Sequence, residues 1–253
     1  VVWARFLGHL LWMGVLFGPK LGASLFKTRF PREQGVRSVV FFVSNLCFIS
    51  ALPNVELATA SAIMFSTPIL VVALSGPMLG ESISLWRWMA VAVGFAGAIV
   101  IIGPYGEFFD PGAAMVLVSA ACFAFYQIWT RKLANRERPE TMIVYTSLVG
   151  AVATTLVCPW FAVAPSGWLP IGAMAGVGLL GGIGQYCIIR ALERAPASFI
   201  SPLGYAELVS ATVFGYVVFS EVPGANTWYG AAIIIISGLA LVYGETLRRR
   251  LAN

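Results

Sequence analysis

Few residues of this 253-residue chain could do chemistry inside an apolar segment, because only 11% are charged and 59% are hydrophobic. Glu207 is one of them, since it lies in the middle of the apolar stretch 197–219. An ionisable group in hydrocarbon costs several kcal/mol, so such groups usually serve binding or ion transfer. We predict that Glu207 binds a substrate amine or carries a proton. The alternative is a neutral Glu207 that hydrogen-bonds to a neighbouring helix.

Other polar side chains in apolar stretches are further candidates for binding a small molecule. Tyr186 and Arg190 are four residues apart and share a helix face, with Gln185 beside them. Arg5 and His9 have the same spacing, and histidine is the side chain that titrates near neutral pH. The remaining candidates are Tyr205, Tyr126, Gln127, Asn45 and Ser66. The alternative for each is structural: an anchor at the membrane edge, a buried group or a helix-packing contact.

Nine apolar segments, each about as long as a membrane span of roughly 20 residues, must position these side chains. They cover 3–25, 37–53, 57–79, 86–103, 111–130, 142–163, 168–189, 197–219 and 227–244. Each should be a helix, because the backbone must satisfy its own hydrogen bonds in lipid. A β-barrel would show alternating runs of about ten residues, and these runs do not alternate. The sequence therefore predicts an all-α integral membrane protein.

Basic residues concentrate in alternate loops. Of the 16 lysines and arginines, all except Arg5 and Lys20 lie either in one set of alternate loops or in the C-terminal tail. Arg37 and Arg87 are among the residues assigned to these loops. The positive-inside rule places this set in the cytoplasm. We therefore expect a multi-pass protein of a bacterial inner membrane with its C-terminus in the cytoplasm.

The chain partly repeats itself at an offset of 140 residues, where Glu81 meets Glu221 and Trp88 meets Trp228. This offset divides the chain into repeats at 1–104 and 105–253, with four and five apolar segments. We expect a first span to precede Val1, which would make the nine visible helices part of a ten-helix, five-plus-five inverted-repeat bundle. Glu81 and Glu221 lie at segment ends, and we expect a structural role for them, such as capping the next helix or pairing with a neighbouring residue.

The repeated pattern resembles the EamA family of the drug/metabolite transporter superfamily. The residues that carry the resemblance are Ala51-Leu52, Ala60-Ser61, Pro68, Leu79-Gly80-Glu81, Arg87-Trp88 and Gly94-Phe95-Ala96-Gly97, with a looser copy in Arg190-Ala191-Leu192, Ala197-Ser198, Ser220-Glu221 and Trp228-Tyr229-Gly230. The resemblance implies ten helices, cytoplasmic termini and a central cavity. It also implies transport, by alternating access, of an amino acid, an S-adenosylmethionine-like compound, a nucleobase-like compound or a vitamin.

The partners expected on this reading are a small-molecule substrate and the lipid bilayer, with protons and a second copy of the chain as further candidates. We expect no cofactor, no metal and no nucleic acid. The alternative is an integral membrane enzyme acting on a lipid-like substrate, but such enzymes gather acidic groups and histidines near one interface. The GxGxxG match at Gly176–Gly181 opens an apolar helix, so we interpret Gly178 and Gly182 as a helix-packing motif.

Overall fold

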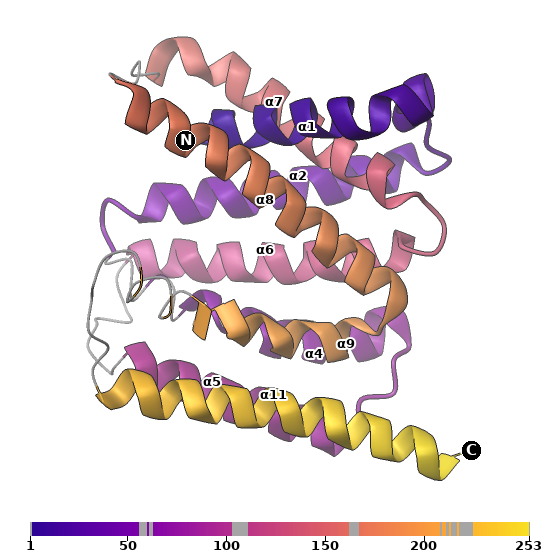
Figure 1. The fold of residues 1–253 in the computed structure, drawn as a ribbon, viewed down its shortest axis with the longest axis vertical. Coiled ribbons are helices and arrows are strands. Elements are labelled where there is room, and N and C mark those ends of the chain that lie inside the picture. Colours follow the sequence, from indigo (N-terminus) through magenta and orange to yellow (C-terminus); the bar gives the residue numbers. More distant parts are fainter. Residues whose placement is uncertain are drawn as a thin grey trace. The chain divides into compact units, whose positions relative to one another are not determined.

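The computed structural model describes residues 2–55, 60, 63–102, 111–161, 167–207, 209–210, 213, 217 and 225–252. Figure 1 shows that these residues form helices and connecting turns, and none of them lies in a strand. The elements are α1 (Val2–Leu21), η1 (Gly22–Phe26), α2 (Pro31–Ala51), α4 (Thr67–Leu79), α5 (Leu85–Ile102), α6 (Pro111–Leu133), α7 (Pro139–Phe161), α8 (Trp168–Arg194), α9 (Ala197–Ile200), η2 (Ser201–Tyr205) and α11 (Ala225–Ala252). The predicted all-α fold is confirmed for the described residues.

The helix ends follow local residue types. Helices α2, α6 and α7 each begin at a proline, whose missing N–H is not needed in the first turn of a helix. Gly80 follows the last residue of α4 and caps the helix, with a φ of 67° and its N–H donated to the carbonyl of Gly76. By length and composition, α2, α6 and α8 are the described helices able to cross a membrane, and α4 and the segment 228–240 are shorter apolar helices.

The chain divides into two compact units. The first comprises Val1–Val43 and Trp129–Arg194, and the second comprises Ser44–Ile128 and Ala195–Asn253. Each unit therefore contains helices from both predicted repeats. We describe each unit by itself.

In the first unit, α1 packs against α7 and α8. Its core includes Met13, Met142 and Ile189. Two glycines bring α1 and α8 together, because a Cβ built on Gly8 would lie 2.6 Å from the Cα of Gly178. The helix-packing interpretation of Gly178 is therefore confirmed, and Gly182, also on α8, lies against the indole of Trp12.

In the second unit, α11 runs along α5, as Figure 1 shows. The carboxylate of Glu81, just after α4, accepts the backbone N–H groups of Ala197 at 2.9 Å and Ser198 at 3.2 Å. It also accepts the Ser198 hydroxyl at 2.5 Å. Glu81 thus caps α9, which confirms the predicted capping role, although the capped helix is not the next one along the chain. Glu221 lies outside the described residues.

The expectation that Arg37 and Arg87 lie in loops is wrong. Arg37 is inside α2 and fully buried, and Arg87 is buried in α5. Arg87 donates to the Ser198 hydroxyl at 2.8 Å. Arg37 donates to Thr146 Oγ1 at 2.7 Å, to Thr130 Oγ1 at 3.3 Å and to the carbonyl of Met142. A guanidinium carries five donors on a long stem, so it can be buried where acceptors from neighbouring segments surround it.

Candidate functional site

Arg5 and His9 face α8 from the same side of α1. A Cβ placed on Gly181 of α8 would lie 3.3 Å from His9 Nε2 and 3.7 Å from Arg5 Nε. His9 is 1% exposed, and its Nε2 has no hydrogen-bond partner among the described residues. Gln185, four residues after Gly181 on α8, is also buried. The interface between α1 and α8 therefore contains the polar side chains of Arg5, His9 and Gln185 within apolar surroundings.

An aromatic cluster continues this interface. The ring centroid of Tyr186 lies 6.3 Å from that of Trp12 and 5.6 Å from that of Phe17, both on α1. The hydroxyl of Tyr186 donates to Glu140 Oε1 at 2.7 Å, which ties α8 to the first turn of α7. The cluster thus joins the polar side chains of this interface to a charged region at the ends of these helices.

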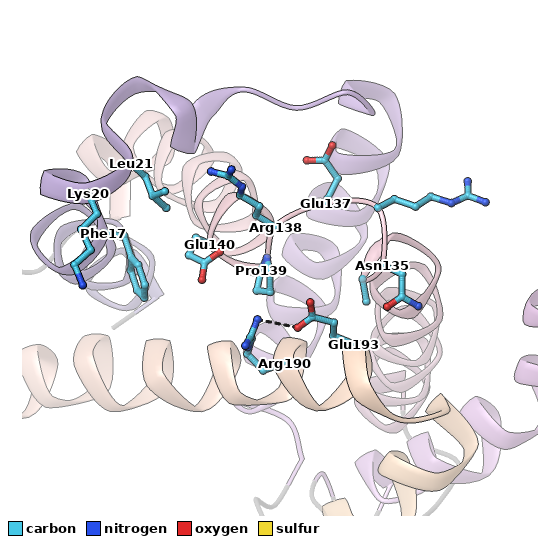
Figure 2. Close-up of a pocket in the computed structure, with 12 residues that line it drawn as sticks. Phe17, Lys20, Leu21, Asn135, Glu137, Arg138, Pro139, Glu140, Arg190 and Glu193 are labelled. Carbon is cyan, nitrogen blue, oxygen red and sulfur yellow. Dashed lines mark ion pairs between the residues drawn. The ribbon is translucent and has the colours of Figure 1, made fainter.

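An open pocket of about 660 Å³ lies at this charged region, between the end of α1, the end of α8 and the turn that joins α6 to α7. Its lining residues are Phe17, Lys20, Leu21, Ala134, Asn135, Arg136, Glu137, Arg138, Pro139, Glu140, Arg190 and Glu193. Figure 2 shows Arg190 and Glu193 on α8 opposite Pro139 and Glu140. The pocket therefore presents cations and carboxylates together.

The charged groups of the pocket are held in position by local contacts. Arg190 Nη1 lies 2.9 Å from Glu193 Oε2, one helical turn away. Arg131, at the end of α6, donates to the carbonyls of Leu192 at 2.6 Å and Glu193 at 3.1 Å, which satisfies the end of α8. A site built in this way can hold a ligand that carries both a positive and a negative group.

Six of the eleven predicted site residues lie in the second unit. Tyr205 is buried, donates its hydroxyl to the carbonyl of Phe65 at 3.1 Å and packs its ring on Gly94. Tyr126 and Gln127 are buried in α6, and the Tyr126 ring stacks on Phe123. These contacts show side chains held firmly in place, and their binding role stays a prediction.

The other three are less enclosed. Asn45 is half-buried in α2, and Glu207 is exposed just after η2. Ser66 is half-buried before α4, and its Oγ has no hydrogen-bond partner among the described residues. Pro68 lies in the first turn of α4, where its carbonyl accepts the Ser201 hydroxyl at 3.2 Å.

The five other predicted residues lie on α1 and α8 in the first unit: Arg5, His9, Gln185, Tyr186 and Arg190. Of these five, Arg190 lines the pocket. The sequence reasoning missed Glu193, although its spacing of three from Arg190 places the two on one helix face. It also missed Glu140 and Phe17, which come from distant segments and carry no local signal. Among the described residues, no group of three or more His, Cys, Asp or Glu could hold a metal.

Comparison with known proteins bears on what this arrangement does. Residues 9–103 and 110–244 match the EamA-like transporter family. An S-adenosylmethionine uptake transporter of Rickettsia felis is 29% identical over 224 residues, which are 88% of this chain and 76% of that protein. A riboflavin transporter of Rhizobium johnstonii is 28% identical over 239 residues, which are 92% of this chain and 78% of that protein.

A solved crystal structure has the same fold, with a TM-score of 0.82 at 23% identity over 100% of this chain and 88% of that one. The named relatives are transporters, which points away from an enzyme. The family match covers most of the sequence in two segments, one on each side of residues 104–109. On these grounds the chain belongs to the EamA-like transporter family.

Proposed function

We propose that this multi-pass membrane protein is a secondary transporter for a zwitterionic small molecule that carries a planar ring, of the S-adenosylmethionine class. The observation that carries the proposal is the pocket at the ends of α1 and α8, where Arg190, Glu193 and Glu140 lie beside the ring of Phe17. The ring of Tyr186 contacts that of Phe17 without lining the pocket itself. Arg190 suits a substrate carboxylate, and Glu140 and Glu193 suit an ammonium group. The ring of Phe17 suits a planar heterocycle.

The names of the relatives support this class without fixing it. The Rickettsia relatives are named for S-adenosylmethionine, an amino acid with a sulfonium and an adenine ring. Other relatives are named for riboflavin, which has a planar ring and no zwitterionic end. The cations and carboxylates of the pocket favour the first chemistry, because they match the two charged ends of an amino acid.

We propose two repeats, 1–104 and 105–253, of opposite orientation, within a five-plus-five bundle. The two matched segments, 9–103 and 110–244, support this division. Such repeats are typical of transporters that work by alternating access. We also propose that the loops with most of the basic residues face the cytoplasm, that the C-terminus lies there, and that the membrane is the bacterial inner membrane. Under this orientation the pocket opens toward the cytoplasm.

A direct uptake assay tests the proposed substrate class. The purified protein would be reconstituted in proteoliposomes and offered labelled S-adenosylmethionine and labelled riboflavin separately. We expect saturable uptake of S-adenosylmethionine, and competition by other amino acids that carry a planar ring. Saturable uptake of riboflavin alone would contradict the proposed substrate class. If neither compound is taken up faster than by empty liposomes, both substrates are contradicted.

A further inference from the structure

A second pocket in the first unit, of about 410 Å³, lies between the loop after η1 and the turn that joins α6 to α7. Its lining residues are Ser24, Lys27, Thr28, Arg29, Arg136, Glu137, Arg138 and Thr141. Four of them are cations and one is a carboxylate, so the pocket is strongly positive. This charge balance differs from that of the larger pocket, where cations and carboxylates are nearly equal in number.

The single carboxylate does not neutralise these cations. Glu137 Oε1 accepts the backbone N–H of Arg29 at 2.9 Å, which uses the carboxylate to hold the loop. Within the part of the chain that the structure describes, no ion pair involves Lys27, Arg29, Arg136 or Arg138. The pocket therefore retains a surplus of positive charge that an anion would satisfy.

The hydroxyl groups of the pocket add neutral donors. Thr28 Oγ1 accepts the N–H of Phe30 at 3.0 Å, so its own O–H remains free to donate. Thr141 is buried at the first turn of α7 and lines the same space. Lysine and arginine with hydroxyl donors form the combination that binds the oxygens of a phosphate group.

An exposed apolar side chain adjoins this basic pocket. Phe26, directly before Lys27, is exposed, and its carbonyl is held by the Tyr145 hydroxyl at 2.9 Å. An exposed aromatic side chain beside a basic pocket matches a ligand with a phosphate head and acyl chains.

We propose that this pocket binds the phosphate of an anionic phospholipid at the membrane surface. The chemistry recognised is a phosphate group, which free phosphate shares, and the exposed Phe26 beside the pocket favours the lipid as its source. Lys27 and Arg29 line this pocket and not the larger one, whereas Arg136, Glu137 and Arg138 line both. The two sites are therefore neighbours, and the lipid site stands whether or not the substrate class is correct.

The test is a thermal-shift titration of the purified protein in neutral detergent. The probes are short-chain phosphatidylglycerol, short-chain phosphatidylcholine and inorganic phosphate. The variant Lys27→Gln/Arg29→Gln removes two cations that line only this pocket. Its matched control, Arg32→Gln/Arg194→Gln, removes two exposed cations of the same unit that line neither pocket.

We expect phosphatidylglycerol to raise the melting temperature of the wild-type protein and the control, and phosphatidylcholine to leave it unchanged. The Lys27→Gln/Arg29→Gln variant should bind phosphatidylglycerol about thirtyfold more weakly. Equal binding by this variant and the wild type, or equal loss in the control, would overturn the site. Stabilisation by inorganic phosphate as large as that by the lipid, and lost in the same variant, would overturn the lipid as the source.

Discussion

At the residue scale, the buried guanidinium of Arg37 is the clearest difference between sequence and structure. A cation near a segment end is ordinarily interpreted as a loop anchor, and Arg37 stands at the start of the predicted segment 37–53. The difference lies in acceptors that come from other helices, such as Thr130 on α6 and Thr146 on α7. Such partners are set by packing and cannot be read from local sequence.

We predict that Arg37→Lys destabilises the protein by about 2 kcal/mol or more, because lysine keeps the charge but loses the planar fork of donors. Arg32→Lys, on the exposed first turn of the same helix, serves as the control and should change stability by less than about 0.5 kcal/mol. Thermal unfolding in detergent, followed by tryptophan fluorescence, measures both. Equal stability of the two variants would show that the Arg37 network contributes little.

Glu207 is the residue for which we predict proton transfer, and His9 is a further candidate for titration near neutral pH. Glu207 is exposed in the second unit, and His9 is buried in the first. If Glu207 carries the coupling proton, Glu207→Gln should abolish the pH dependence of flux in proteoliposomes, because glutamine does not titrate. His9→Gln should then leave that dependence in place. If the Glu207→Gln protein keeps the wild-type flux and its pH dependence, Glu207 has no part in the mechanism. If flux becomes independent of pH only in the His9→Gln protein, His9 carries the proton.

At the element scale, the interface of α1 with α8 depends on glycine. A Cβ on Gly182 would lie 1.9 Å from Trp12 Nε1, whereas a Cβ on Gly184 of the same helix would meet nothing within 4 Å. Overpacking of this kind costs about 1–3 kcal/mol. We predict that Gly182→Ala lowers the melting temperature, and that Gly184→Ala leaves it unchanged or raises it, because alanine favours helix. A Gly182→Ala protein as stable as Gly184→Ala would contradict this packing.

Much of the element scale could be predicted from the sequence. Apolar runs indicated where helices lie, and the spacing of Gly178 and Gly182 indicated a packing face. The sequence predicted that Glu81 caps a helix, but it could not predict which one. The N–H of Ala197 that Glu81 accepts lies 116 residues further along the chain. The pocket lining was least predictable, since Phe17, Glu140 and Arg190 come from three separate helices.

At the scale of the whole molecule, family membership and pocket chemistry lead to one testable claim. The family match establishes the kind of protein, and the paired charges beside the ring of Phe17 suggest what it moves. Transport of a zwitterionic molecule through this pocket depends neither on the five-plus-five arrangement nor on the orientation in the membrane, so each can be tested separately. It requires that Arg190 contacts the substrate.

The most direct test is the KM for S-adenosylmethionine uptake by Arg190→Gln and Arg194→Gln proteins in proteoliposomes. The two residues lie one turn apart on α8, and Arg194 is exposed and does not line the pocket. We predict that Arg190→Gln raises KM by about tenfold or more, as expected for the loss of a charged hydrogen bond, and that Arg194→Gln changes it less than about twofold. Equal KM values for the two variants would contradict the claim that Arg190 binds the substrate.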